Sequence, residues 1–289
     1  MRRRSLLAAW GGASAMARAA PLTLRFPGPR DAFDRRNVAI EELVRLLFDA
    51  AGQPVVLQKV PGLSQPRQIY ELRDGHVDLA LAASSQEDLP GIQLLRQPLR
   101  RGLLGLRLLV ATPEMAPRLA EVRSIEELRR WTMGYGADWA DLNAMRTLEL
   151  KVVTASTYAG LFRMLELGRF DWLHRGVNEI WGEMDQPGLV GRLVVVPRVA
   201  LYYPLDDYFC VSDQRPDLLR LLRIGFARML RDGRYAAWFQ RHHGDSLRRA
   251  QMAKRLVLHL DGYGVPVGTP MHSFDVLQLA ATRAELRVP

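Results

Sequence analysis

The chain has 289 residues, of which 48% are hydrophobic and 25% charged, and its formal net charge is +9. This length and composition allow one large domain or two of ordinary size with a sizeable buried core. There is no run of about 18 apolar residues, the length that crosses a bilayer as a helix, and the single cysteine, Cys210, excludes an intrachain disulfide. Its strand-like context, YFCVS, favours a buried thiol.

The first 19 residues have the layout of an export signal. An arginine cluster at residues 2–4 precedes a short apolar run at residues 6–15, and Ala17 and Ala19 match an Ala-x-Ala cleavage site. Cleavage after Ala19 would remove four of the 40 basic residues and none of the 31 acidic ones, so the net charge would fall from +9 to +5. We expect residues 1–19 to be a signal peptide, exported by the general or the twin-arginine route, and the mature protein to be periplasmic, soluble and without a lipid anchor. The alternative is a basic N-terminus on a cytosolic protein.

The remaining basic residues do not form a nucleic-acid-binding surface in the sequence. They are interspersed with acids, as in RSIEELRR and RMLRDGR, which is typical of solvated helix faces. No basic tract with interleaved aromatic residues occurs, so nucleic acid is not expected as a partner.

Strand and helix patterns alternate along the first part of the chain. In chain order they predict strand 22–26, helix 37–51, strand 55–60, helix 65–73 and strand 77–82. Gly52 and Gly75 end the two helices. Strands separated by helices indicate βαβ units and a parallel sheet.

A second alternating series follows. It predicts strand 106–111, strand 131–136, helix 141–149, strand 151–156, helix 158–167, strand 170–174, helix 177–184, strand 193–197 and strand 208–212. Ser124 and Glu127 have the spacing of a capping box. The segment 216–239 is predicted as one long or twice-broken helix, and residues 256–260 as a short strand.

One local pattern occurs in both series. Leu, Gly and Asp stand at the same spacing in YELRDGHVDLALAAS (Leu72, Gly75, Asp78) and in RMLELGRFDWLHRG (Leu165, Gly168, Asp171). The leucine is suited to pack the last helical turn, the glycine to take the left-handed position after it, and the aspartate to open a short buried strand. The repetition predicts two α/β lobes of similar construction.

Polar residues follow the corresponding strand in each predicted lobe. Arg175, Asn178 and Glu179 come directly after strand 170–174, and Ser84 and Ser85 follow strand 77–82. Ligands of open α/β sheets bind beyond the carboxyl ends of the strands. Two such edges that face each other would form a ligand cleft.

With these patterns the chain resembles a known family from about Leu22 to His243. The segments that carry the resemblance are the helix-Gly-x-x-Asp strands, QPLRRGLLGLRLLVA, SIEELRRWTMGYGADW and YFCVSDQRPDLLRLLRIGFARMLRDGRYAAWFQRHHG. They are similar to the bacterial extracytoplasmic solute-binding proteins of the amino-acid-binding type, and the match includes a subgroup with GRFDWLHRGVNEI and LYYPLDDYF in similar form.

The resemblance implies an α/β, two-lobed type II periplasmic-binding-protein fold. Each lobe would be a mostly parallel sheet flanked by helices, and two hinge strands, near 102–108 and 202–209, would join them. The first lobe would take residues 20–104 and 207–289, with a C-terminal extension from about 244 packed on it, and the second lobe residues 105–206. Such lobes close around a ligand by hinge motion.

One departure from the family concerns the ligand. Amino-acid binders of this type usually carry Thr-x-x-Arg after the first-lobe strand, and its arginine binds the ligand carboxylate. The corresponding segment here, ASSQEDLPGI, has no arginine. This departure puts a free α-amino acid in question, and Arg100 or Arg175 could substitute.

Nine residues are candidate ligand contacts: Arg175, Glu179, Asn178, Trp139, Gly136, Arg100, Ser84, Ser85 and Tyr158. Arg175 leads, because a guanidinium binds a carboxylate with two parallel hydrogen bonds; an ion pair with Glu179, four residues on, is the alternative. Asn178 could cap a helix or contact the ligand. Gly136 could admit backbone N–H groups to an anion, while Trp139 and Tyr158 could line the cleft or pack in the core.

The function expected from these features is capture of a small polar or charged solute, amino-acid-like or another carboxylate, for an ABC-type transporter. We expect a monomer. We expect no cofactor or metal, since no catalytic or metal-binding spacing occurs. Two alternatives stay open. One is a dehydratase or lyase that uses Glu179 or Glu87 as acid or base, and the other is a ligand-sensing partner of a membrane receptor.

Overall fold

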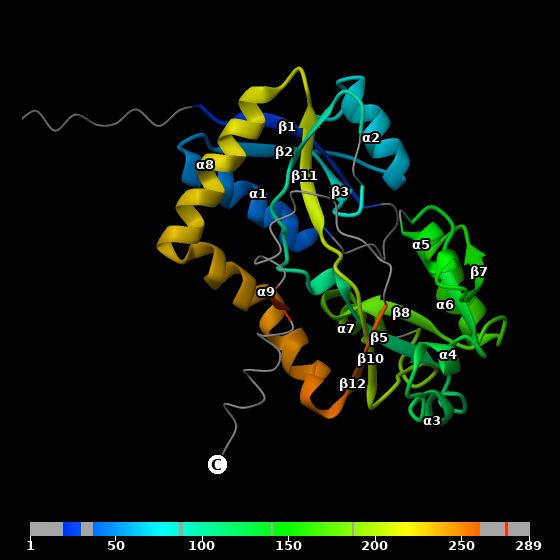
Figure 1. Ribbon diagram of the computed structural model, residues 1–289. Helices are drawn as coiled ribbons and strands as arrows, with labels where there is room; N and C mark the ends of the chain where they lie inside the picture. Colours follow the sequence, from blue (N-terminus) through cyan, green and yellow to red (C-terminus); the bar gives the residue numbers. More distant parts are fainter. Residues whose placement is uncertain are drawn as a thin grey trace, which may run out of the picture.

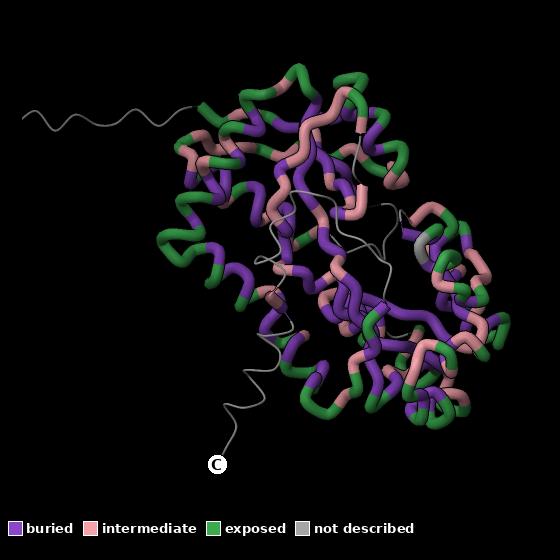
Figure 2. Tube along the Cα trace, viewed as in Figure 1, coloured by how far each residue is buried: buried purple, intermediate pink, exposed green. Residues whose placement is uncertain are grey.

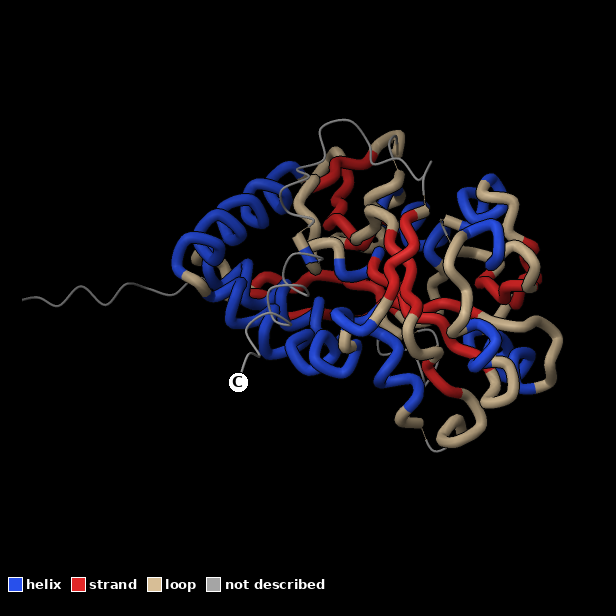
Figure 3. The backbone as a smooth tube through the Cα atoms, turned by 60° about the horizontal axis from the view of Figure 1, so that its bottom comes forward, coloured by secondary structure: helices blue, strands red, loops and turns tan. Residues whose placement is uncertain are grey.

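The computed structural model describes residues 20–29, 37–86, 89–139, 141–186, 188–260 and 275–276. The predicted signal peptide and Glu87 lie outside these residues. The described chain forms two lobes of strands and helices, which lie one above the other in Figure 1. Helices and strands occur in both lobes, as the turned view of Figure 3 shows.

The first lobe contains two groups of paired strands. They are β1 (Leu22–Pro27) and β2 (Val55–Val60), which pair in parallel, and β3 (Ala80–Ala83), β11 (Asp207–Ser212) and β4 (Ile92–Leu95), which pair antiparallel in that order. The helices are α1 (Val38–Ala51), α2 (Gln65–Arg73) and α8 (Pro216–Asp232). Helices α1 and α8 cross closely at Gly225, where an added Cβ would lie 2.2 Å from the carbonyl oxygen of Leu47.

The second lobe is built around β5 (Leu106–Ala111). This strand is antiparallel to β8 (Leu173–Gly176), β9 (Val194–Val195) and β10 (Val199–Tyr202), and β6 (Thr132–Gly136) pairs in parallel with β7 (Lys151–Ala155). A parallel bridge between Met133 and Trp172 links these two groups of strands. The helices are α3 (Ala116–Leu119), α4 (Ile125–Leu128), α5 (Leu142–Thr147), α6 (Tyr158–Glu166) and α7 (Val177–Met184), and η1 (Leu103–Gly105) precedes β5.

The expectation of mostly parallel sheets needs one correction. Parallel pairs join β1 to β2 and β6 to β7, as the alternating pattern predicts, but antiparallel pairs are more numerous. The reason is that β5 and β11 are the first strands after the two connections between the lobes. In the second lobe β5 is antiparallel to β8, and in the first lobe β11 is antiparallel to β3 and β4.

The Leu-Gly-Asp pattern has the same structure in both lobes. Gly75 and Gly168 have φ angles of 73° and 63°, in the left-handed region that favours glycine. The Asp78 carboxylate accepts a hydrogen bond from the backbone N–H of Arg25 at 2.7 Å, and the Asp171 carboxylate accepts one from Thr132 at 2.7 Å. The aspartate thus ties the start of β3 to β1 in the first lobe and the start of β8 to β6 in the second. The predicted likeness of the lobes is confirmed for this motif.

Asp78 is expected to make folding stability depend on pH. Burial by itself would raise the pKa of Asp78, but the side-chain and backbone hydrogen bonds from Arg25 outweigh it, and the pKa lies below the ordinary value. A depressed carboxyl pKa stabilises the fold above the unfolded-state pKa, about 3.9, and this contribution is lost as the pH falls through the folded-state value. Asp78→Asn should therefore be less stable than the wild type near neutral pH, with a difference that shrinks in acid. Urea unfolding at several pH values measures this, and a constant difference would contradict it.

Asp206 joins the two connections between the lobes. Its carboxylate accepts hydrogen bonds from the backbone N–H groups of Arg100 at 3.0 Å and Gly102 at 2.7 Å, and its own N–H donates to the Ser84 hydroxyl at 2.9 Å. Asp206 is fully buried. These bonds hold the segments before β5 and before β11 side by side, at the place where a hinge is expected.

Helix α9 (Arg234–Ala250) runs from the first lobe to the second (Figure 1). Its early part binds α1, where the Trp238 indole N–H donates to the carbonyl oxygen of Ala39 at 3.1 Å and His242 lies 2.6 Å from Glu42. Its late part binds α7, where the Trp181 indole N–H donates to the carbonyl oxygen of Ser246 at 3.1 Å. The helix predicted for 216–239 therefore breaks once, at Gly233, and its second part spans both lobes.

Part of the C-terminal extension packs on the second lobe, whereas Asp275 and Val276 contact Arg101, within the predicted first-lobe range. After η2 (Met252–Lys254), β12 (Leu256–His259) pairs in parallel with β10 of the second lobe. The prediction that the extension packs on the first lobe is therefore wrong for this strand. The edge of a sheet has unpaired backbone N–H and C=O groups that can pair with another strand, and β12 pairs with the edge strand β10. The exact lobe boundaries stay a prediction.

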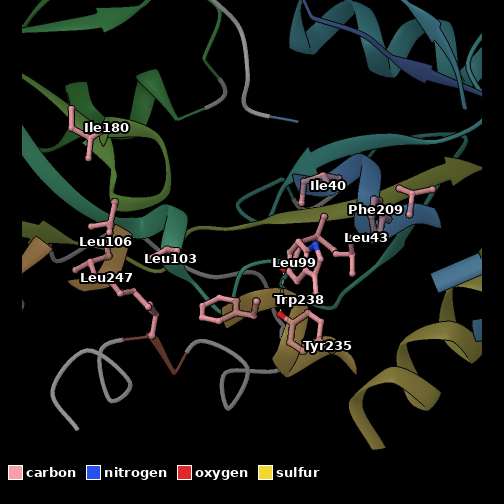
Figure 4. Packing of buried hydrophobic residues seen from close by; sticks show 14 of the residues in the cluster. Ile40, Leu43, Leu99, Leu103, Leu106, Ile180, Phe209, Tyr235, Trp238 and Leu247 are labelled. Carbon is pink, nitrogen blue, oxygen red and sulfur yellow. Dashed lines mark hydrogen bonds between the residues drawn. The ribbon is translucent and has the colours of Figure 1, made fainter. Parts of the chain in front are cut away.

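One hydrophobic cluster extends through both lobes. Figure 4 shows Ile40 and Leu43 of α1, Leu103 of the connection and Ile180 of α7 in this cluster, together with Trp238 of α9. All five side chains are fully buried. Buried positions fill the interior of both lobes along the trace in Figure 2. The lobes thus share part of their core beneath α9.

Candidate functional site

A pocket of about 750 Å³, its open mouth included, lies between the lobes. Gln65, Gln68 and Ala83 line it from the first lobe, and Tyr135, Trp139 and Glu179 line it from the second. Arg100 and Asp207 line it from the connections. This is the position expected for a cleft between two facing sheet edges.

Arg175, the leading candidate, lies in this pocket but is already bound by carboxylates. Its Nε donates to the Glu183 carboxylate at 3.0 Å and its Nη2 donates to the same group at 2.8 Å. The ion pair with Glu179 that the spacing allows is present, at 3.1 Å. The guanidinium also lies 4.8 Å above the Trp139 ring. Arg175 is only 2% exposed, and these contacts satisfy most of its hydrogen-bonding capacity.

Arg100, the second candidate, is committed in the same way. Its Nη1 donates to the Asp207 carboxylate at 2.7 Å and lies 3.7 Å from Asp206. Arg100 is 2% exposed. It neutralises the acids of the second connection and forms part of the pocket wall.

Arg107 at the start of β5 is the third guanidinium that lines the pocket, and its pairing is the weakest of the three. Its Nη1 lies 3.5 Å from the Glu179 carboxylate and its Nη2 lies 3.9 Å from that of Asp141. Within the described residues, its Nε is buried and has no hydrogen-bond partner. Burial by itself would lower the pKa of Arg107, but Tyr203, Tyr135 and the nearby carboxylates raise it above the ordinary value, so the side chain stays charged.

Tyr135 offers a second unpaired group beside Arg107. Its hydroxyl is buried and makes no hydrogen bond of good geometry in the part of the chain that the structure describes, and burial together with the nearby Asp141 carboxylate raises the pKa of Tyr135 well above its ordinary value. The ring packs edge-on against Trp139, with 4.7 Å between the ring centroids. An unpaired buried donor costs about 1–3 kcal/mol, so Arg107 and Tyr135 together form a place where a carboxylate would be stabilised.

Gly136 was predicted to let backbone N–H groups approach an anion, but its backbone is covered by the Trp139 side chain. A Cβ at this position would lie 2.5 Å from the indole ring of Trp139. The glycine therefore makes room for the indole, and the space above its backbone is filled by this ring. Trp139 itself lines the pocket and also packs against the hydrophobic clusters, so both alternatives stated for it hold in part.

The remaining predicted ligand contacts are not among the residues that line this pocket. Ser84 binds the backbone of Asp206, and Ser85 follows it at the end of β3, half-buried. Tyr158 donates to Glu183 and lines a second hollow together with Asn178. Asn178 does not cap α7, because it is the second residue of the helix and the N-cap is Gly176. The Glu179 carboxylate accepts the N–H of Gly176 at 3.1 Å.

Sequence reasoning missed Arg107 and Tyr135. Arg107 is the one charged residue within LGLRLLVA, an apolar run that predicts a fully buried strand. An arginine is almost never fully buried without a partner or a function, so this position carried a usable signal.

The described residues contain neither a metal-binding cluster nor a membrane-spanning helix. No three histidine, cysteine, aspartate or glutamate side chains in those ranges gather as a metal site would require. None of the helices in the described ranges is long and apolar enough to cross a bilayer.

Comparison with known proteins shows the fold. No family model matches the chain, and no curated protein matches it. Among solved structures, it is similar to the GluR0 ligand-binding core in complex with L-glutamate (TM-score 0.59, 15% identity, 78% of this chain and 100% of that one). It is also similar to the amino acid ABC transporter substrate-binding protein AbpA from Streptococcus pneumoniae bound to L-arginine (0.58, 14%, 78% and 95%). A third is a histidine kinase sensor domain with similarity to periplasmic binding proteins (0.54, 18%, 78% and 97%).

These similarities, together with the two lobes and the pocket between them, define the class of fold. The chain has the two-lobed type II periplasmic-binding-protein fold. The resemblance noted in the sequence is thus confirmed at the level of the fold.

Proposed function

We propose that this protein binds a small solute with a carboxylate and an amino group in the pocket between its lobes. The observation that carries the proposal is Arg107, a buried guanidinium that lines this pocket and whose contacts with the Glu179 and Asp141 carboxylates, at 3.5 and 3.9 Å, are long. A ligand carboxylate would accept hydrogen bonds from Arg107 and from the Tyr135 hydroxyl, which makes no hydrogen bond of good geometry within the described residues.

The acidic lining supports an amino group on the same solute. Asp141 and Asp207 line the pocket alongside Arg107. Asp141 accepts a hydrogen bond from the Tyr203 hydroxyl at 3.2 Å, and its distance of 3.9 Å from Arg107 leaves it able to accept from an ammonium group. A pocket with both charges favours a zwitterion over a simple anion, because each ligand charge finds its opposite.

In this proposal, Arg107 takes the place of the missing Thr-x-x-Arg arginine. It approaches the pocket from the second lobe, where the family arginine would come from the first. The absence of the Thr-x-x-Arg arginine therefore does not argue against an amino acid ligand in this proposal.

The solved structures support a binding role. GluR0 is described with L-glutamate and AbpA with L-arginine, and both share this fold. The proposal places the mature protein in the periplasm, as a monomer that delivers its solute to an ABC-type transporter. The sensor domain with the same fold keeps the sensing alternative open.

The enzyme alternative receives no support from Glu179. Its carboxylate accepts the N–H of Gly176 and lies within ion-pair distance of Arg175 and Arg107. These contacts engage both oxygens of the Glu179 carboxylate, so the side chain is held by the protein rather than placed to act on a substrate. Glu87, the other residue proposed for catalysis, lies outside the described residues.

Thermal-shift measurements on protein without residues 1–19 test the proposal. The panel pairs amino acids with analogues that lack the amino group, such as L-glutamate with glutarate. A true ligand at about 100 times its dissociation constant should add about 2.7 kcal/mol of stability, and its deaminated analogue should add less. If no carboxylate in the panel stabilises the protein, the proposal fails.

A further inference from the structure

A second hollow of about 720 Å³, its open mouth included, lies next to the interlobe pocket. Arg100 and Glu179 line both, so they form a shared wall. The other walls come from both lobes and from the helix that spans them: Ala39 of α1, Asn178 of α7 and His243 of α9 are among the lining residues. The proposed solute site does not account for this space.

Two buried polar atoms in this wall have no partner in the part of the chain that the structure describes. They are Oδ1 of Asn178 and Nε2 of His243. His243 is only 4% exposed. Buried polar groups in folded proteins are nearly always hydrogen-bonded, so each such atom calls for an occupant of the space that it borders.

Gly182, near the end of α7, leaves one wall of the hollow bare. Glycine disfavours a helix relative to alanine because it loses more backbone freedom on folding. A close helix contact would explain its presence, as at Gly225, but no atom lies within 4 Å of a Cβ added to Gly182. The missing side chain therefore serves no packing against the described residues. Gly182 is exposed and lines the hollow, so a larger side chain at this position would narrow it.

The charged side chains around the hollow already have partners. Glu183 is bound by Arg175, Arg100 by Asp207, and His242 lies 2.6 Å from Glu42. Burial, with help from Arg100 and His242, lowers the pKa of His243 to about 3, so its ring is neutral near pH 7. Among the described lining residues, a charged ligand would find no unpaired counter-charge, and the two unpaired atoms are both neutral.

We infer that this hollow is a second binding site, for a small neutral molecule rich in hydroxyl groups such as a polyol. A hydroxyl donates to Asn178 Oδ1, and a second one donates to or accepts from His243 Nε2, depending on the ring tautomer. The remaining hydroxyl groups face Gly182 and the open mouth. The inference does not depend on the solute proposed for the interlobe pocket.

Isothermal titration with xylitol tests the inference, with Gly182 as the decisive position. Wild-type protein should bind xylitol saturably at one site. Gly182→Leu fills the hollow and should abolish the binding, whereas Asn178→Leu should weaken it by about tenfold, as expected for one lost hydrogen bond. Gly182→Ala should melt at a higher temperature than the wild type without xylitol, since alanine favours the helix and meets no protein atom, and should bind xylitol more weakly.

Two controls keep the outcome interpretable. Arg107→Met, which removes the proposed solute contact in the other pocket, should bind xylitol as the wild type does, so the two proposals fail separately. Circular dichroism establishes that each Gly182 variant is folded. If xylitol does not bind the wild type, or binds Gly182→Leu equally well, water alone fills the hollow and the inference is overturned.

Discussion

Replacing Arg107 by methionine is expected to abolish solute binding and leave the protein folded. Loss of one member of a buried, hydrogen-bonded charge pair costs about 2–5 kcal/mol, so affinity should fall by about 30-fold or more. Methionine has a similar length and fills the same apolar surroundings. Because the nearest carboxylates are 3.5 and 3.9 Å away, less native pairing is lost than in a variant of Arg175, and stability without ligand should fall by less than it does for Arg175→Ala. Calorimetric titration and urea unfolding measure the two quantities.

Arg107→Lys is the matched control for this prediction. Lysine keeps the charge but loses the planar two-pronged donor geometry, so its affinity should lie between those of the wild type and Arg107→Met. Solute binding by Arg107→Met within a few-fold of the wild type would show that the carboxylate is held elsewhere.

Replacing Arg175 by alanine is expected to destabilise the fold strongly, by about 3–5 kcal/mol, because it leaves buried carboxylates without their cation. Glu183 and Glu179 are the carboxylates concerned, and their side chains are 6% and 7% exposed. The variant also loses the contacts of the guanidinium with Trp139 and Tyr158. Urea unfolding near neutral pH measures the loss directly.

The double variant Arg175→Met, Glu183→Gln separates charge from packing. It removes most of the uncompensated charge, so it should recover a large part of the stability that Arg175→Ala loses. If Arg175→Ala is instead as stable as the wild type and fails only in binding, Arg175 is the ligand contact that the sequence suggested, and our assignment of Arg107 is wrong.

Local patterns predicted much of the fold because they depend on short-range physics. The glycines of the repeated Leu-Gly-Asp motif take left-handed angles, and Ser124 caps α4 by accepting the N–H of Glu127, as the capping box predicts. The course of α9 was not predictable in this way. Its apolar stripe shows that one face is buried, but the stripe does not say that its two halves pack on different lobes.

The site was harder to predict because ion pairing with carboxylates decides which arginine is available to bind a ligand. Arg175, Arg100 and Arg107 are alike as residue types, and all three line the pocket. What distinguishes them is the position of the carboxylates in space: Glu183, eight residues after Arg175, lies beyond the helical spacing that sequence reasoning considers. Asp207 reaches Arg100 from the other connection. Such contacts follow only from the tertiary structure.

A crystal structure of the protein with its solute tests the central assignment most directly. We expect the solute between the lobes, with its carboxylate oxygens within hydrogen-bonding distance of Arg107 and Tyr135 and its amino group near Asp141. A solute bound outside this pocket, or one whose carboxylate is held by Arg175 with the Glu183 pair broken, would contradict the account.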